Sequence, residues 1–138
     1  MFKTIAVAAV VGGIPGVFTS WLITGVLFHP YQRATPATWR SREGGAQYAG
    51  ASATKILLAA MIAMLVATTG GVHAFGVASA TGGGVLLAIL CWAAAALPAL
   101  LSVGLFVNLH PAVVVGLLLD WLVVSTIAGA VAGFLVGR

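Results

Sequence analysis

Long uninterrupted runs of apolar residues dominate the chain, and short polar segments separate them. A helix that crosses the hydrocarbon core of a bilayer needs about 20 mostly apolar residues. The runs do not alternate between apolar and polar positions, which argues against the roughly ten-residue strands of a membrane β-barrel. The pattern therefore predicts four spanning helices, at about residues 5–28, 56–75, 85–106 and 111–136.

The connections between the predicted helices differ in length and polarity. Residues 29–55 form a long polar connection, with Pro30 and Pro36 as helix breakers. A linker rich in Gly, Ser and Thr covers 76–84, and only 107–110 separate the last two predicted helices. Helices joined by so tight a turn are antiparallel neighbours. We predict an all-α integral membrane four-helix bundle that forms a single membrane domain of 138 residues.

The composition supports this architecture and excludes several classes of protein. Of the 138 residues, 62% are hydrophobic and 6% are charged, whereas soluble domains carry roughly 25% charged residues. So few charges cannot cover a water-exposed surface, which argues against a free soluble enzyme. Disordered chains are poor in apolar residues, so disorder is excluded as well. The expected partner is the lipid bilayer.

The net charge of +4 predicts an orientation rather than a nucleic-acid partner, because the basic residues cluster near the ends of the predicted helices. Four lie in the long connection and two on the opposite side: Arg33, Arg40, Arg42 and Lys55 against Lys3 and Arg138. This excess predicts that 29–55 is cytoplasmic and that both termini lie outside. The three arginines could also hold an anionic lipid headgroup, although enforcing topology is the simpler explanation.

Small residues recur at four-residue spacing in the first and fourth predicted helices and form one face of each. Lipid supplies no hydrophobic drive between helices, so close packing depends on small residues. The faces consist of Gly12, Gly16, Ser20 and Thr24 in the first helix, and of Ser125, Gly129, Gly133 and Gly137 in the fourth. We predict that the two faces pack together, within one chain or across a homo-oligomer. The simpler alternative is that glycine is common in membrane helices.

Asp120 is the one charged residue inside a predicted helix. It lies about nine residues, or ~13 Å, into the fourth helix, where a carboxylate costs about 2.5–3.5 kcal/mol on insertion scales. No Lys or Arg lies in any predicted span, so we expect neutral partners at the same depth, with Ser20 and the Trp21 indole as candidates. Two interpretations of Asp120 stay open: a neutral carboxylic acid that hydrogen-bonds across helices, and a proton or cation site in a water-filled path.

Histidines and aromatic residues gather where the long connection meets the predicted membrane surface. His29 and His110 each precede a proline there, and Tyr31 and Trp39 fit the aromatic belt at the headgroups. The two histidines could meet, although capping of helix ends is the simpler role. Their spacing matches no metal-ligand pattern, and the sequence has no phosphate loop and no HExxH motif. We therefore predict no metal, no cofactor and no catalytic residue.

The pattern resembles a family of small bacterial four-span integral membrane proteins that is classed as a domain of unknown function. The matching segments are, in chain order, Trp21, Gly25-Val26-Leu27-Phe28, Trp39, Trp92, Leu105-Phe106, Leu118-Leu119-Asp120 and Gly129-Ala130. The chain departs from the family's pattern at His29-Pro30, where a Gly-containing segment is expected. The resemblance implies four spans in a bacterial plasma (inner) membrane. It implies no active site, because the family's biochemical role is not established.

These observations leave three classes of function open for the protein. We expect an accessory or structural subunit that assembles through its glycine faces, as a homo-oligomer or within a larger membrane complex. The alternative is a small oligomeric transporter or channel that uses Asp120 as an intramembrane proton or cation site. A membrane enzyme is least favoured, because it would have to be built from Asp120 and the histidines alone. A cavity that reaches Asp120 from the side of His29 and His110 would favour the transporter.

Overall fold

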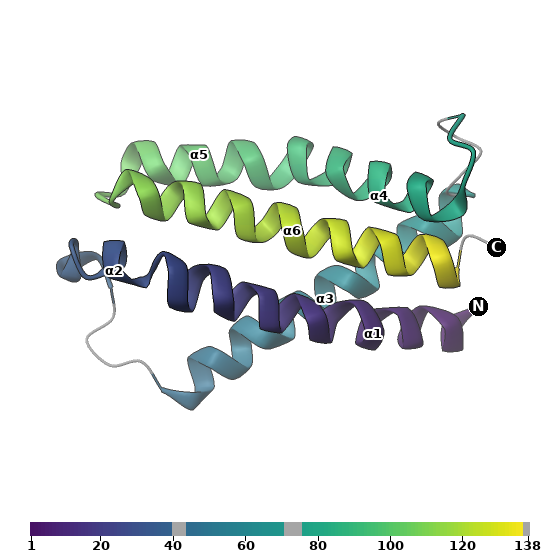
Figure 1. The fold of residues 1–138 in the computed structure, drawn as a ribbon, viewed down its shortest axis with the longest axis horizontal. Helices are drawn as coiled ribbons and strands as arrows, with labels where there is room; N and C mark the ends of the chain where they lie inside the picture. Colours follow the sequence, from purple (N-terminus) through teal and green to yellow (C-terminus); the bar gives the residue numbers. More distant parts are fainter. Residues whose placement is uncertain (40–43, 71–75, 137–138) are drawn as a thin grey trace.

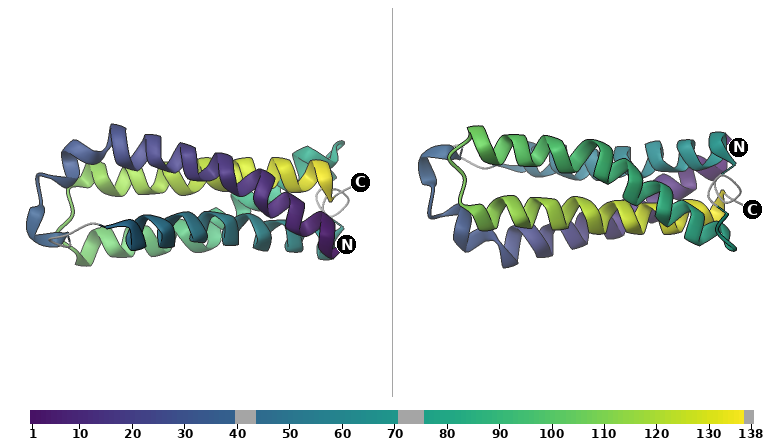
Figure 2. Two further views of the ribbon diagram at one scale, coloured as in Figure 1. Left: turned by 90° about the horizontal axis from the view of Figure 1, so that it is seen from below. Right: turned by 90° about the horizontal axis from the view of Figure 1, so that it is seen from above.

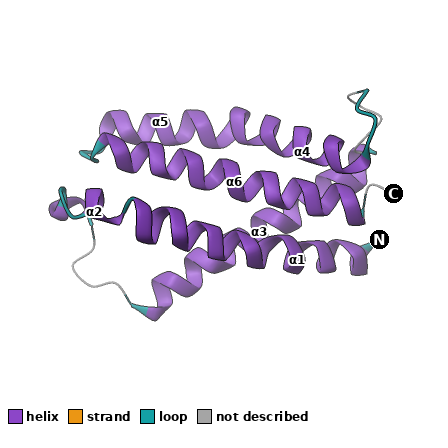
Figure 3. Ribbon diagram, viewed as in Figure 1, coloured by secondary structure: helices purple, strands orange, loops and turns teal. Residues whose placement is uncertain are grey.

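The computed structural model describes residues 1–39, 44–70 and 76–136. Within these residues the chain is helical and no strand occurs (Figure 3). Four helical spans in this described part are long and apolar enough to cross a membrane: Phe2–Leu27, Gly45–Thr69, Ala80–Phe106 and Pro111–Leu135. The predicted all-α four-helix bundle is therefore confirmed, and its spans are compatible with a multi-pass membrane protein.

Two of the spans are single α-helices, and two combine several helical elements. α3 covers Gly45–Thr69 and α6 covers Pro111–Leu135. The first span joins α1 (Phe2–Ser20) to the π-helical η1 (Trp21–Leu27). The third span joins α4 (Ala80–Cys91), the π-helical η4 (Trp92–Ala96) and α5 (Leu97–Phe106). Two short helices, α2 (His29–Gln32) and the 3₁₀ turn η2 (Pro36–Thr38), follow the first span.

The π-helical turn of the third span has its cause in the sequence. Pro98 has no N–H to bond to the carbonyl of Ala94, four residues back. The preceding residue, Leu97, donates its N–H to the carbonyl of Trp92, five residues back, which is the π-helical pattern. The third span therefore widens at this turn and continues as α5.

α6 is the central helix of the bundle and contacts the other three spans. Figures 1 and 2 show α4 and α5 along one side of α6 and α1 along another, while α3 crosses α1 obliquely. The N-terminus and the end of α6 lie at one end of the bundle, and α2 and the α5–α6 turn lie at the other. The core where the four spans meet consists mainly of small side chains, which lets the helix backbones approach closely: Ala8, Ala59, Ala63, Ala88, Ala128 and Ala132, with Ile62, Val66 and Leu87.

The second span begins earlier than the sequence predicted. Residues 56–75 were expected, but α3 covers Gly45–Thr69, so the second half of the predicted polar connection is helical. The segment 45–54 has few large apolar side chains but four alanines, and alanine has the highest helix propensity. The side-chain oxygen of Gln47 also accepts the N–H of Gly44 at 3.0 Å and so satisfies a free donor where the helix begins. The other three spans start or end within a few residues of their predicted bounds.

The glycine faces are buried inside the chain, but they do not pack on each other. A methyl group added at Gly12 would lie 3.3 Å from the Cα atom of Ala128 in α6. The fourth-helix glycines turn to α4 instead, where a Cβ atom at Gly133 would lie 2.8 Å from the Cα atom of Thr81. The predicted pairing of the two faces is therefore wrong, because α6 has neighbours on both sides and its glycines face the α4 side. Gly137, the last member of the predicted face, lies outside the described residues.

Candidate functional site

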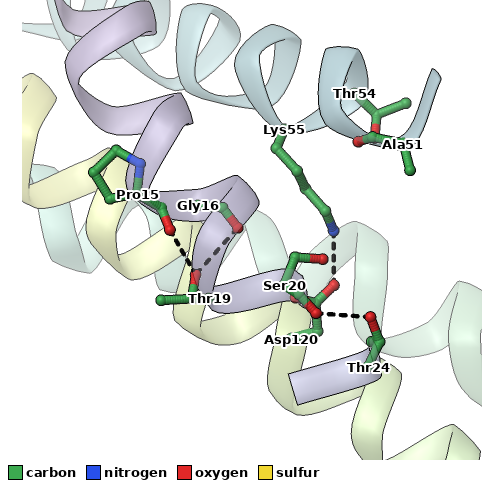
Figure 4. A network of polar contacts seen from close by, with 9 residues as sticks. All are labelled: Pro15, Gly16, Thr19, Ser20, Thr24, Ala51, Thr54, Lys55 and Asp120. Carbon is green, nitrogen blue, oxygen red and sulfur yellow. Dashed lines mark hydrogen bonds and ion pairs between the residues drawn. The ribbon is translucent and has the colours of Figure 1, made fainter. Parts of the chain in front are cut away.

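A buried ion pair joins α3 to α6. The Lys55 Nζ atom lies 2.7 Å from the Asp120 Oδ2 atom, and the two side chains are 7% and 2% exposed (Figure 4). The sequence-based expectation that Asp120 has only neutral partners is therefore wrong. It failed because Lys55 was assigned to the polar connection, whereas the structure places it ten residues after Gly45, inside the second span.

Both members of the pair lie at the same depth in the bundle. Asp120 is nine residues after Pro111 in α6, and Lys55 is ten residues after Gly45 in α3. At 1.5 Å per residue these positions are about 14 Å and 15 Å from the helix ends on the α2 side. This depth corresponds to the hydrocarbon core of a bilayer, whose thickness is about 30 Å.

The surroundings of the pair leave part of its hydrogen-bonding capacity unused. The Lys55 Nζ atom lies 4.4 Å from the centre of the Trp121 ring, a cation–π contact. The Asp120 Oδ1 atom is buried and has no hydrogen-bond partner in the described part of the chain. Burying two ions costs several kcal/mol each, and their attraction offsets this only when the remaining polar atoms are satisfied. Stability alone therefore does not account for this pair, and ionisable residues in membrane spans typically mark functional sites.

A cavity of about 1110 Å³ leads from Lys55 toward the α2 end of the bundle. Its polar and aromatic lining comes from the first span, α2, η2 and α3: Phe18, Ser20, Trp21, Thr24, His29, Gln32, Thr38, Trp39, Gln47, Tyr48, Ser52 and Lys55. Lys55 is the deepest of the α3 residues that line it. The cavity therefore extends from the α2 end of the bundle to Lys55 of the buried pair.

The cavity exists because α1 and α3 meet closely at one point and then diverge. At Gly13 an added Cβ atom would lie 2.8 Å from the Cα atom of Ile56, so the two backbones touch there. Beyond this contact the helices separate toward the α2 end (Figure 1). The first half of α3, Gly45–Thr54, is exposed along almost its whole length. The crossing at Gly13 thus leaves a space between the helices, and Lys55 lies next to the crossing point.

Ser20 and Trp21, the predicted neutral partners of Asp120, both line the cavity. Figure 4 shows the Ser20 side chain beside the ion pair, and the Ser20 carbonyl accepts the Thr24 hydroxyl at 2.7 Å. Trp21 is 63% exposed, which is incompatible with a role as the partner of a buried carboxylate. The predicted depth was correct, but Lys55 on a third helix provides the partner.

The residues predicted at the membrane surface form two small groups around α2. The His29 ring accepts the Nε–H of Arg33 at 3.2 Å and contacts the Gln32 side chain through Nδ1 at 3.1 Å. The His110 Nδ1 atom accepts the N–H of Ala112 and caps α6, and its ring stacks on Tyr31 with the ring centres 5.0 Å apart. Each histidine thus has local partners of its own.

Metal and lipid sites have little structural support. Within the described residues, no group of three or more His, Cys, Asp or Glu is arranged to hold a metal ion. Of the three arginines predicted at the headgroups, Arg33 contacts His29, whereas Arg40 and Arg42 lie outside the described residues. A lipid-headgroup site at these arginines stays a prediction.

Trp39, which the sequence placed in the aromatic belt together with Tyr31, is half-buried. Its side chain lines the cavity, and its indole Nε1 atom is buried without a hydrogen-bond partner in the described structure. An indole nitrogen can only donate. The described part of the chain therefore provides no acceptor for this donor.

Comparisons of the chain with models of protein families, with curated proteins and with solved structures find no match.

Proposed function

We propose that the protein is a small membrane transport protein and that the Lys55–Asp120 pair is the polar centre of its transport path. The observation that carries this proposal is the cavity of about 1110 Å³ that ends at Lys55. Charged residues inside membrane spans are costly and occur mainly along substrate paths, ion paths and proton relays. A pair that served packing alone would not need a cavity between it and the membrane surface.

The proposal changes the chemistry that Asp120 alone suggested. A proton or cation site on Asp120 would need a carboxylate that is open to the path, but its Oδ2 atom is already bound by Lys55. Lys55 lines the cavity, so a solute that enters from the α2 side meets the ammonium first. Transport then requires the solute to compete with Asp120 for Lys55 or to pass beside the pair.

An accessory subunit that assembles through glycine faces has less support than a transporter. Gly12, Gly16, Gly129 and Gly133 are all buried by the chain's own helices, so these faces are already occupied. A homo-oligomer, or a place in a larger membrane complex, would have to use other surfaces. Both stay predictions.

We propose a bacterial plasma membrane, with the α2 side of the bundle in the cytoplasm. Lys55 lies within a span and no longer counts as a charge of the connecting loop. Three arginines, Arg33, Arg40 and Arg42, still precede α3 on this side, against Lys3 and Arg138 on the other. The excess of basic residues still favours this orientation, by a smaller margin.

Water access to the cavity can be tested with single cysteines, because Cys91 is the one cysteine of the chain. In a Cys91→Ala background, we expect Ser52→Cys to react at least tenfold faster with a membrane-impermeant methanethiosulfonate than Ala53→Cys does. Ser52 lines the cavity, whereas Ala53 is exposed and does not line it. A thiol in hydrocarbon stays protonated, and only the thiolate reacts. The reagent is added to sealed vesicles from one side at a time, and equal slow reaction at both positions would contradict the proposal.

Transport itself can be measured without knowing the solute. Proteoliposomes are mixed in a stopped-flow instrument with hyperosmotic glycerol, choline chloride or sodium lactate, and light scattering follows the recovery of volume. We expect wild-type protein to accelerate recovery in at least one of the three solutes, and Lys55→Met/Asp120→Leu to remove at least nine-tenths of that effect, because it removes both charges of the centre. If no solute enters faster than in protein-free liposomes, the transport role is wrong and an accessory role gains support.

A further inference from the structure

We infer that the cavity binds a monovalent organic anion, with its charged head at Lys55 and its apolar body along the aromatic walls. This inference deepens the proposed function and rests on it for the cavity as the path of the solute. It follows from three properties of the cavity: its charge, its unused hydrogen-bond donors and its apolar lining.

The charge of the cavity favours an anion. Lys55 is the charged residue among the lining residues that the structure describes, and no Asp or Glu is among them. Asp120 contacts Lys55 but is not among the lining residues, so the basic member of the pair is the one that borders the cavity. At the far end, Arg33 donates to His29, a lining residue. A cavity with one sign of charge and low-dielectric walls concentrates ions of the opposite sign.

The hydrogen-bonding groups favour a ligand that accepts. An ammonium has three N–H donors, and the structure gives Lys55 one hydrogen bond, to Asp120 Oδ2. Trp39 also lines the cavity, and its buried indole N–H has no acceptor in the part of the chain that the structure describes. Hydrogen bonds from an ammonium to an anionic oxygen are about twice as strong as neutral ones. A carboxylate or a phosphate monoanion would accept the hydrogen bonds that Lys55 can still donate.

The walls favour a ligand with an apolar body. Val17, Phe18, Trp21 and Tyr48 line the cavity, and Phe18 and Trp21 are 67% and 63% exposed, at its rim. Ligand sites typically combine apolar and aromatic walls with a few polar groups that orient the ligand. A rim of exposed aromatic side chains in a membrane span admits a ligand from the bilayer, and the α2 end admits one from water. The shared chemistry is an amphipathic monoanion.

The first test measures the charge preference with Ser52→Cys in the Cys91→Ala background. The cysteine is modified with the anionic sulfonatoethyl and with the cationic trimethylammonioethyl methanethiosulfonate. Each rate is divided by the rate of the same reagent with a small free thiol, which corrects for the intrinsic reactivity of the reagent. The corrected ratio is the anionic rate over the cationic rate after this division. We expect the corrected ratio to favour the anionic reagent about tenfold. The charge-swapped pair Lys55→Asp/Asp120→Lys should invert this preference, because it places a carboxylate on the cavity side. A corrected ratio that favours the cationic reagent would overturn the inference.

The second test measures protection of the same cysteine by unreactive ligands. Dodecanoate, hexanoate and dodecyltrimethylammonium are added at equal concentrations, and we expect at least fivefold slower modification with a carboxylate and less than twofold with the cation. Protection by dodecanoate alone indicates a ligand from the bilayer, and protection by hexanoate as well indicates a ligand from water. Lys55→Met/Asp120→Leu removes the ammonium without leaving a lone buried charge, so it should weaken protection about tenfold even if the charge-swapped variant does not fold.

The outcomes separate the two proposals. If Ser52→Cys reacts with neither reagent, water does not reach the cavity, and both the transport proposal and the ligand assignment fail. If it reacts but dodecyltrimethylammonium protects at least as well as the carboxylates, or neither carboxylate protects, only the ligand assignment fails. In that case the transport proposal would still stand on the flux measurement.

Discussion

Replacing Lys55 with methionine is expected to lower the free energy of unfolding by about 3–5 kcal/mol, because it leaves a buried carboxylate without its partner. Asp120 is 2% exposed, and its Oδ1 atom already lacks a hydrogen bond in the described structure, so no other group there can take over the charge. Unfolding in mixed micelles, titrated with sodium dodecyl sulfate and followed by far-ultraviolet circular dichroism, measures the change.

Two controls distinguish the missing ion pair from a general effect of losing a lysine. Lys3→Met removes an exposed lysine and should change the free energy of unfolding by less than about 0.5 kcal/mol. The double variant Lys55→Met/Asp120→Leu replaces both ions with apolar groups and should recover most of the loss, because such replacements are often neutral or stabilising. A loss below about 1 kcal/mol in Lys55→Met would mean that Asp120 is stable as a neutral acid, one of the two interpretations that the sequence left open.

The four spans could be predicted from the sequence, because hydropathy over about 20 residues is a strong local signal. The start of the second span could not, because 45–54 consists of Gly, Ala, Ser, Thr, Gln and Tyr, whose mean hydropathy is that of a loop. The alanines of this segment, and the lack of proline between 44 and 55, are the signals that favoured a helix. In the second span, the less apolar segment 45–54 thus extends the apolar helix at its N-terminal end, and part of this segment lines the cavity.

The partner of Asp120 depended on this one boundary. Once Lys55 lies in a helix, the cost of an unpaired charge in a membrane makes its pairing with Asp120 the expected result. The cavity could not be predicted in this way, because it depends on where α1 and α3 cross. That crossing is set by the contact of Gly13 with Ile56, and a glycine pattern does not indicate which partner it will meet.

The same ambiguity affected the glycine faces. Four-residue spacing of small residues predicts close helix packing, and the structure has close packing at these positions. The sequence gives no information on which helix lies opposite, so the fourth-helix face was paired with α1 when its partner is α4. The short turn before Pro111 was the better guide, because it already made the third and fourth spans neighbours.

Gly129→Leu is expected to disrupt the contact between α4 and α6 and to lower the free energy of unfolding by about 3 kcal/mol or more, at the upper end of overpacking effects. An added Cβ atom at Gly129 would lie 2.7 Å from the Cβ atom of Ala88, closer than real Cβ atoms come. Its other neighbours are backbone atoms of Gly84, which cannot turn away as a long side chain can. The two helices would have to separate along this face, and the micelle titration used for Lys55 measures the loss.

Gly50→Ala is the matched control, because nothing lies within 4 Å of a Cβ atom added there. It should be neutral or stabilise the protein by up to about 1 kcal/mol, since alanine favours a helix more than glycine does. The mass of the purified protein in mild detergent, measured in parallel, distinguishes packing within the chain from packing between chains. If Gly129→Leu keeps its stability but changes the oligomeric mass, the glycine face binds a second copy and the α4–α6 contact is not its main role. If stability falls while the mass of the folded fraction stays constant, the face holds α4 and α6 together, and a homo-oligomer must form through another surface.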